Sequence, residues 1–254
     1  MSNSPLVEYL RFSPNHSGKR LCAINRITPH CVVGQCSIEA LGALFSDPKY
    51  RLSSNYGIDV TGKIGMFVEE ENRSWCSSSG ANDNRAVTIE CASDTNAPYK
   101  MNDAVYNSLV KLCVDICKRN GKTKLLWIED KGKALSYVPA ENEMLLTVHR
   151  WFANKACPGE WLFSRLGRLA EEVNTSLSGQ PEKPADGEFS PFLVRIITLG
   201  VIVRDGAGVN RKKTGECPPG VYTIVDEKAD KNGTLWYKLK SGMGWICSDY
   251  ADKL

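Results

Sequence analysis

A polar stretch divides this chain of 254 residues into a long first part and a short second part. Residues 175–190, TSLSGQPEKPADGEFS, combine Pro, Gly and Ser with almost no apolar side chains. Such a segment buries too little surface to pack and is typical of a linker. We therefore predict a first domain over residues 1–175, a linker over residues 176–191 and a second, small domain over residues 192–254.

Composition and charge exclude several classes of protein. Apolar residues make up 42% of the chain, which is enough for a buried core. No stretch approaches the roughly 18 consecutive apolar residues of a membrane span, so we expect no membrane insertion. The formal net charge of +3 is too small to indicate nucleic-acid binding. The N-terminus, MSNSPLVEYLRFSP, lacks the features of a secretory signal, so we expect synthesis in the cytoplasm.

The ten cysteines contain no CxxC pair, which argues against a zinc ribbon or a thioredoxin-like site. In a reducing cytoplasm most of them should be small buried hydrophobes. Cys113 and Cys117 fit this expectation, because they lie four residues apart on an apolar helix face. A local disulfide between Cys31 and Cys36 after export is the alternative for that pair.

Hydrophobic patterning predicts alternating strands and helices in the first part. The segments that are apolar or β-branched enough for strands are Leu21–Val33, Asn55–Val60, Lys63–Glu69, Arg85–Ala92 and Met144–Trp151. Apolar residues at helical spacing predict helices after an N-cap at Ser37, from about Asp103 to Asn120, and from near Pro158. The polar loop SSSGANDN, residues 77–84, is a candidate lining of a substrate groove.

Two of the three histidines lie where predicted strands end, His30 in ITPHCVVGQ and His149 in LLTVHRWF. Cys157 follows His149 by eight residues, on a loop before the last predicted helix. A thiolate and two imidazoles suit zinc, and three protein ligands leave a fourth position open for water, as in catalytic zinc sites. A purely structural role for the histidines is the alternative. His16, in the polar segment PNHSGKR, is expected to be solvated and is not a predicted ligand.

The first 175 residues resemble the zinc amidase family that includes phage lysozyme-type amidases and the peptidoglycan recognition proteins. The strongest match is the block H…K-x-C-P-G, formed here by His149, Lys155 and Cys157-Pro158-Gly159. Weaker matches precede it in the family's order, at His30, Tyr56 to Gly62, Trp75 and Ile89-Glu90. The chain departs from many relatives at Cys76, where they have His, and at Ser54, where some have Tyr.

This resemblance implies an α/β fold with a mixed central β-sheet flanked by helices, and hydrolysis of the amide between N-acetylmuramic acid and L-alanine. It implies that Zn²⁺ is held by His30, His149 and Cys157. Glu90 would be the general base toward water and then the acid toward the leaving amine. Lys155 would stabilise the developing oxyanion. The alternatives are an outward-facing strand residue for Glu90 and a simple surface residue for Lys155.

The second part has short strand candidates separated by turns, LVRIITLGVIVRDGAG, GVYTIVDE, TLWYKLKSG and MGWICSDY, which predict a small β-barrel. It resembles the bacterial SH3-like domains of cell-wall enzymes at Val203–Gly208, Trp236–Lys238 and Gly244–Ile246, with departures at Ile202 and Asp205. The resemblance implies wall binding, with Trp236, Tyr237 and Trp245 as candidate contacts. The same aromatics could instead form the barrel core.

The order of an amidase, a linker and an SH3-like domain, without a signal peptide, resembles a phage endolysin. Such an enzyme would reach the peptidoglycan of a Gram-positive wall after its release by a separate membrane-permeabilising protein. A bacterial autolysin, an endopeptidase and a recognition protein that binds peptidoglycan without cleaving it are the alternatives. The intact Cys157 and Lys155 argue against the last of these.

Overall fold

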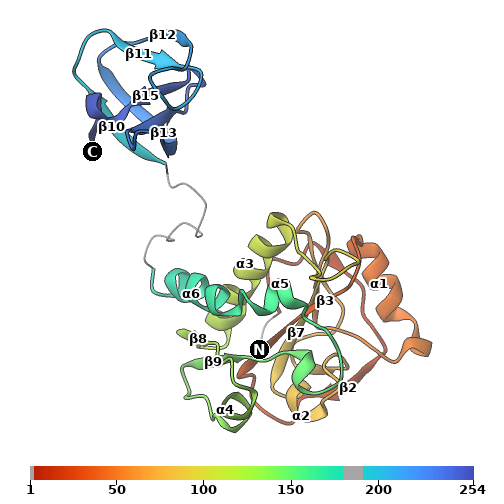
Figure 1. Cartoon of the computed structure of the whole chain (residues 1–254). Helices are drawn as coiled ribbons and strands as arrows, with labels where there is room; N and C mark the ends of the chain where they lie inside the picture. The colour runs from red at the N-terminus through yellow and green to blue at the C-terminus, as the bar shows by residue number, and fades with distance from the viewer. Residues whose placement is uncertain (1–2, 180–190) are drawn as a thin grey trace. The chain divides into compact units, whose positions relative to one another are not determined.

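The computed structural model describes residues 3–179 and 191–254 of the chain (Figure 1). Contacts divide the chain into two compact units, Met1–Lys183 and Pro184–Leu254. Most of the predicted linker lies outside the described residues, but its first two residues belong to the helix α6 (Leu166–Leu177). No helix among the described residues is both long and apolar enough to cross a membrane.

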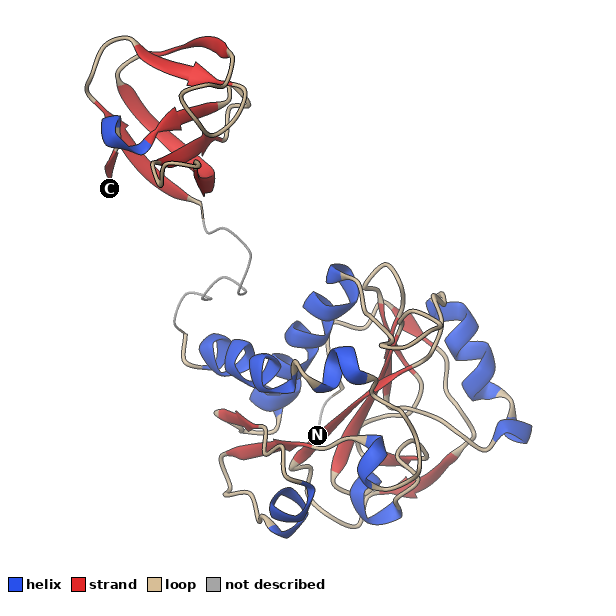
Figure 2. Cartoon of the chain, viewed as in Figure 1, coloured by secondary structure: helices blue, strands red, loops and turns tan. Residues whose placement is uncertain are grey.

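The first unit is built on a mixed sheet, which confirms the predicted α/β architecture (Figure 2). In the part of the chain that is described, the strand order is β1-β5-β4-β7-β3-β9-β8. Of the strand pairs described in this sheet, only β4–β5 is antiparallel, as expected for two strands joined by the turn at Thr61-Gly62. The strands are β1 (Tyr9–Leu10), β3 (Arg26–Cys31), β4 (Tyr56–Ile58), β5 (Ile64–Met66), β7 (Ala86–Cys91), β8 (Lys124–Leu126) and β9 (Glu143–Leu146).

The central strands present two chemically different faces. Side chains of a strand alternate between the faces of its sheet. In β3, Ile27 and Cys31 join the main hydrophobic core, whereas Thr28 and His30 point to the other side, where they meet polar partners. In β7, Ile89 likewise faces the core. One face of the sheet is therefore apolar, and the other carries buried polar groups.

Two helices cover the apolar face. The helix α3 (Asp103–Arg119) packs against α6 (Figure 1) and supplies a buried stripe to the core. Asn102 caps the N-terminus of α3, because its side chain accepts a hydrogen bond from the backbone N–H of Val105 at 3.0 Å. Asn120 ends the helix, one residue beyond the last helical position. Cys113 and Cys117 lie fully buried on this helix, as predicted.

The helix α1 (Ile38–Ser46) lies over β4 and β5, with the predicted N-cap Ser37 accepting from the N–H of Ala40. It fits closely because the strands carry glycine beneath it. A Cβ at Gly57 would lie 2.6 Å from Phe67, and one at Gly65 would lie 2.6 Å from Ile38. The two glycines thus let α1 approach the sheet and bury its apolar face.

Smaller elements complete the first unit. A two-stranded antiparallel ribbon pairs β2 (His16–Lys19) with β6 (Asn72–Ser74). The short helices are α2 (Gly80–Asp83), α4 (Lys131–Ser136) and α5 (Glu160–Phe163). His16 lies in β2, where its Nδ1 accepts a hydrogen bond from the N–H of Gly18 at 3.0 Å.

Two sequence-based boundaries were wrong. The strand predicted over Met144–Trp151 ends at Leu146, and His149 instead begins a single 3₁₀ turn. The helix predicted from near Pro158 is two helices, α5 and α6, with Arg165 between them in a non-helical conformation. Leu162 and Leu166 keep the four-residue spacing of one helix across this break, so periodicity could not reveal it.

The second unit is entirely antiparallel among its described residues, with strand order β12-β11-β15-β14-β13-β10-β16. Its core is made of its own apolar residues, which include Val194, Val203 and Ile246. This agrees with the predicted separate all-β part. The strands are β10 (Phe192–Ile196), β11 (Val201–Arg204), β12 (Lys213–Cys217), β13 (Gly220–Ala229), β14 (Leu235–Leu239), β15 (Trp245–Cys247) and β16 (Asp252–Lys253).

Two of the three aromatics considered as wall contacts are buried. Trp236 is 2% exposed and donates its Nε1–H to Asp230 at 3.2 Å, and Tyr237 is 5% exposed and packs in the core. Both therefore fit the alternative, a structural role, because a side chain without free surface cannot contact a polymer. Trp245 is half-buried, with the ammonium of Lys238 5.9 Å from its ring centre, and it remains a candidate.

Candidate functional site

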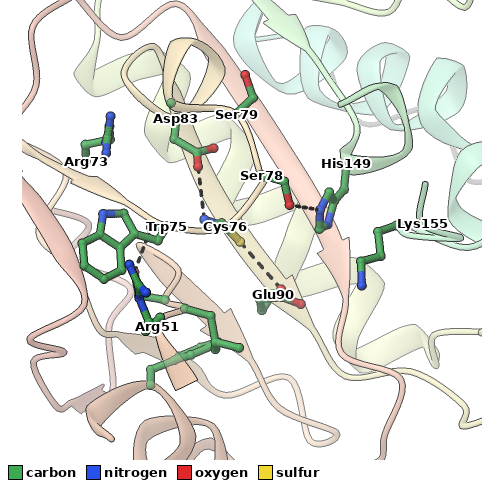
Figure 3. A pocket seen from close by; sticks show the side chains of 14 residues that line it. Arg51, Arg73, Trp75, Cys76, Ser78, Ser79, Asp83, Glu90, His149 and Lys155 are labelled. Atoms are coloured by element: carbon green, nitrogen blue, oxygen red, sulfur yellow. Dashed lines mark hydrogen bonds between the residues drawn. The ribbon is translucent and has the colours of Figure 1, made fainter. Parts of the chain in front are cut away.

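A pocket of about 430 Å³ opens on the polar face of the sheet (Figure 3). This volume lies within the range of small-molecule sites. Among the described residues, its lining includes the predicted Glu90, His149 and Lys155. The remaining lining residues are Phe45, Arg51, Leu52, Ser53, Arg73, Trp75, Cys76, Ser78, Ser79, Gly80 and Asp83.

The parallel pairing of β3 and β7 brings His30 and Glu90 together. The two residues are direct partners in the register, near the carboxyl ends of their strands. His30 Nδ1 lies 3.9 Å from Glu90 Oε1, and the His30 side chain is fully buried while that of Glu90 is 19% exposed. His30 Nε2 and Glu90 Oε2 are both buried without a hydrogen-bond partner in the described structure. Such orphaned groups are costly, which points to a missing partner.

The segment after β9 supplies the other two predicted metal ligands. The rings of His149 and His30 lie 5.1 Å apart, and Cys157 Sγ lies 3.3 Å from His30 Nδ1. One ligand atom from each of the three residues lies within 4.8 Å of the others. The structure therefore brings together the three side chains that sequence analysis singled out, from positions 127 residues apart at most.

Backbone and side-chain contacts hold this segment in place. The N–H of Arg150 donates to the carbonyl of Cys157 at 3.1 Å, closing the loop between the two ligands. The Arg150 guanidinium donates to the carbonyl of Ala156 at 2.8 Å and pairs with Glu160 at 3.1 Å. Gly159 has φ of +82°, and a Cβ there would lie 2.8 Å from the carbonyl oxygen of Pro98. The loop is thus shaped by its own chain and by a glycine that no larger residue can replace without strain.

Burial keeps both histidines neutral. The pKa of His30 is lowered to about 3 by burial and by the nearby His149. The pKa of His149 is lowered by burial and by the charge of Lys155. A neutral imidazole has a free lone pair, which is the form that binds a metal. The pKa of the Cys157 thiol is raised by its hydrogen bond with Cys31, by burial and by Glu90.

Glu90 has the environment of an acid–base group. Burial raises the pKa of its carboxyl to about 7. The thiol of Cys76 donates to Glu90 Oε1 at 3.6 Å and opposes this shift (Figure 3). A carboxyl with a pKa near neutrality can accept and return a proton under physiological conditions. The alternative of an outward-facing strand residue does not describe its position, because Glu90 lines the pocket.

Lys155 and Ser78 flank His149 at the pocket rim. The Oγ of Ser78 lies 2.9 Å from His149 Nε2 (Figure 3), and Lys155 is close enough to shift the pKa of that histidine. Ser78 belongs to the polar loop predicted to line a groove, and this loop does contribute to the pocket. Its second half, however, forms α2, where Asn82 and Asp83 are buried.

The buried polar groups that hold this loop were not predicted from the sequence. The Asp83 carboxylate accepts hydrogen bonds from the N–H groups of Cys76 and Ser77, at 3.1 and 3.2 Å to Oδ2. Asn82 donates to Thr28 at 3.0 Å and accepts from Thr147 at 3.0 Å, and these threonines precede the two histidines by two residues. The Asn-Asp pair in SSSGANDN is the part of the sequence that forms this network. It could not be recognised there, because a solvated polar loop and a buried polar network have the same composition.

The far end of the pocket is basic and aromatic. Arg51, Arg73 and Trp75 line it, and the Nε1–H of Trp75 donates to Ser17 Oγ at 2.6 Å. Arg51 has a left-handed backbone with φ of +51°.

All ten cysteines are free thiols, so the alternative of a Cys31–Cys36 disulfide is not realised in this structure. Tyr56, near the position where some relatives use a tyrosine, instead donates its hydroxyl to the buried Glu70 at 2.6 Å.

Comparison with solved structures gives resemblances at low identity. The chain is similar to a mutant endolysin from Bacillus subtilis, at 13% identity, covering 68% of this chain and 99% of that one with a TM-score of 0.47. It is similar to a selenomethionine derivative of AmpD, at 20% identity, 64% and 93% coverage and a TM-score of 0.45. The catalytic domain of XlyA aligns at 13% identity, 65% and 97% coverage and a TM-score of 0.46.

Comparison with curated proteins found no match. A family model does match, under the description N-acetylmuramoyl-L-alanine amidase, over residues 20–160. This range contains His30, Glu90, His149, Lys155 and Cys157, and it ends at the start of α5. Because the match covers more than half of the 254 residues, the chain belongs to the N-acetylmuramoyl-L-alanine amidase family.

Proposed function

We propose that this chain is a zinc-dependent peptidoglycan hydrolase that cleaves the amide between the lactyl group of N-acetylmuramic acid and L-alanine. The observation that carries the proposal is the convergence of His30, His149 and Cys157 within 4.8 Å, beside a pocket-lining Glu90. Membership of the amidase family supports the bond that is cut.

The donor atoms fit zinc in kind and in spacing. Zinc bonds of about 2.0 Å to nitrogen and 2.3 Å to sulfur, at a tetrahedral angle, put these two donors about 3.5 Å apart. The observed separation of His30 Nδ1 and Cys157 Sγ is 3.3 Å. Two neutral imidazoles and a thiolate are a typical zinc set, and a fourth position would remain for water or substrate.

The protein groups around this position can do the proton chemistry. Bound zinc would supply Lewis-acid activation of water and of the scissile carbonyl. Glu90 would take the proton of the attacking water and pass it to the leaving amine of L-alanine, a role that its pKa of about 7 suits. The Lys155 ammonium would stabilise negative charge on the carbonyl oxygen, since it lines the pocket near His149.

The second unit would anchor the enzyme to its substrate. We infer that residues 192–254 form an SH3-like wall-binding domain, from the resemblance at Val203–Gly208 and from the antiparallel sheet with its own core. Together with the amidase unit this supports an endolysin-like enzyme that acts on the walls of Gram-positive bacteria.

The proposal is tested by incubating the purified, zinc-loaded chain with purified peptidoglycan. We expect new free amino groups, and mass spectrometry should find stem peptides that begin with L-alanine and glycan strands without peptide. Fragments cut inside the stem peptide would instead identify an endopeptidase. Binding to walls with no release of amino groups would identify a recognition protein.

A further inference from the structure

Cys76 gives the pocket a second group of metal-binding atoms. Its Sγ lies 3.6 Å from Glu90 Oε1 and points toward that carboxylate (Figure 3). With His30, these two residues form a second set whose ligand atoms all lie within 4.8 Å of one another. Of these three residues only Cys76 has no part in the proposed hydrolysis, and it stands where many amidases have a histidine.

The carboxylate beside Cys76 has unused capacity. Glu90 Oε2 is buried and has no hydrogen-bond partner in the described structure, although the same carboxylate meets the Cys76 thiol through Oε1. A carboxylate has about four lone-pair positions, and leaving one oxygen unpaired inside a protein is unfavourable. A cation held between Cys76 Sγ and Glu90 Oε1 would compensate the negative charge of this buried carboxylate.

The position of the thiol is fixed by the backbone. The N–H of Cys76 donates to Asp83 Oδ2 at 3.1 Å, and the following N–H of Ser77 donates to the same carboxylate. Asp83 is itself buried at the C-terminal end of α2. Cys76 therefore faces Glu90 from a segment whose backbone is held by hydrogen bonds to Asp83.

The spacing of the two donors suits a thiophilic cation. Bond lengths of about 2.1 Å to a carboxylate oxygen and 2.3 Å to sulfur, at a tetrahedral angle, separate these donors by about 3.6 Å. The observed separation of Cys76 Sγ and Glu90 Oε1 is 3.6 Å. A thiolate selects soft or borderline ions such as Zn²⁺ over Mg²⁺ or Ca²⁺.

We propose that Cys76 and Glu90 form a second, weaker zinc position next to the His30–His149–Cys157 site, which is filled only when zinc is in excess and then inhibits the enzyme. It is weaker because only two protein groups are free to bind once the first site holds His30. The inhibitory part rests on the proposed function, since zinc on Glu90 removes the carboxylate that would transfer the proton.

The first measurement uses the unmodified full-length chain. Equilibrium dialysis should show one tightly bound zinc and a second that binds at least tenfold more weakly. Iodoacetamide alkylation, followed by peptide mass spectrometry, should show that filling the second position slows the labelling of Cys76 at least fivefold. The half-buried Cys22, which does not line the pocket, is an internal control whose labelling should not change.

Variants then assign each zinc to its ligands. Cys76→Ser should lose the second zinc, keep the first, and resist inhibition by excess zinc, whereas Cys157→Ser should lose the first. This proposal would be overturned, and the amidase proposal left intact, if the unmodified chain bound a single zinc. The same holds if the second equivalent of zinc did not change the rate of Cys76 labelling. Loss of the first zinc in Cys76→Ser would also overturn it. Absence of amide hydrolysis at one equivalent of zinc would contradict the amidase proposal alone.

Discussion

His30 and Glu90 show how one pairing register creates a reactive site from residues far apart in the chain. Each lies among apolar neighbours on its own strand, where a buried imidazole or carboxylate is unfavourable. Because β3 and β7 pair in parallel with these residues opposite each other, His30 Nδ1 and Glu90 Oε1 lie 3.9 Å apart. Among the residues that the structure describes, His30 Nε2 and Glu90 Oε2 have no hydrogen-bond partner, a cost that functional sites often tolerate.

Replacing Cys157 tests the metal site at the residue scale. Cys157→Ser exchanges a thiolate for a hydroxyl, which is a poor zinc ligand at neutral pH. We expect zinc content, measured by atomic emission, and wall lysis, measured by turbidity, to fall together. Cys22→Ser is the matched control and should change neither. Undiminished lysis by the Cys157→Ser variant would refute the zinc assignment.

Replacing Glu90 separates proton transfer from metal binding. Glu90→Gln keeps the shape of the side chain and removes its basicity. We expect a full equivalent of zinc at the first site and a kcat lower by roughly 10²–10⁴-fold, which is the usual contribution of a positioned acid–base group. The measurement is amino-group release at saturating substrate. A variant that keeps full turnover would show that Glu90 is not the base.

The sequence revealed some of these residues and not others. His149, Lys155 and Cys157 form one compact block, so their association is visible locally. Asn82, Asp83 and Cys76 act through contacts with strands that the sequence does not place beside them. No local pattern distinguishes a buried asparagine in a network from a solvated one in a loop. Their roles emerge only when the sheet is assembled.

At the element scale, helix ends were predictable where a cap is encoded locally. Ser37 starts α1, and α3 occupies almost the predicted range because Gly121 follows a continuous apolar stripe. The end of β9 was not predictable in this way. The residues Thr147 and Val148 continue the apolar, β-branched composition beyond the last paired position, Leu146, and only the tertiary structure ends the strand there.

The Asn82 network joins α2, β3 and the segment that follows β9, and a substitution of Asn82 tests that connection. Asn82 on α2 bonds the hydroxyls of Thr28 and Thr147, which also contact each other at 2.7 Å. Asn82→Ala leaves these buried groups with fewer partners, so we expect the free energy of unfolding to fall by about 1–3 kcal/mol. Urea denaturation followed by tryptophan fluorescence measures this change.

An exposed asparagine provides the comparison for that experiment. Asn96→Ala, on the loop after β7, should alter the unfolding free energy by less than about 0.5 kcal/mol. We also expect Asn82→Ala to weaken zinc binding, because the two threonines position the segments that carry His30 and His149. Equal stability of the two variants would mean that the network does not hold the site together.

At the scale of the whole molecule, we expect the first unit to carry the hydrolysis and the second unit to attach the enzyme to the wall. We expect a chain that ends at Lys183 to hydrolyse a soluble muramoyl peptide as fast as the full chain, because the site lies entirely in the first unit. On intact Gram-positive walls its activity should fall about tenfold or more, since a second binding unit raises the local concentration of the first. Turbidity and amino-group assays measure the two activities.

The second unit by itself provides the control for wall attachment. Residues 191–254, fused to a fluorescent protein, should co-sediment with walls, and Trp245→Ala should reduce this binding while leaving the fold intact. The buried Trp236 is unsuitable for such a test, because its removal would disturb the fold of the second unit. Equal lysis of walls by the full and shortened chains would remove the basis for a wall-binding role.

Each unit buries an apolar core made of its own residues. Loss of folding in one unit therefore does not require loss of folding in the other. A copy whose amidase unit has denatured, through heat or a harmful substitution, would still attach to walls if the second unit binds them. Such damaged copies would occupy attachment sites and act as competitors of intact enzyme, so ageing preparations should lose lytic activity faster than they lose native catalytic units.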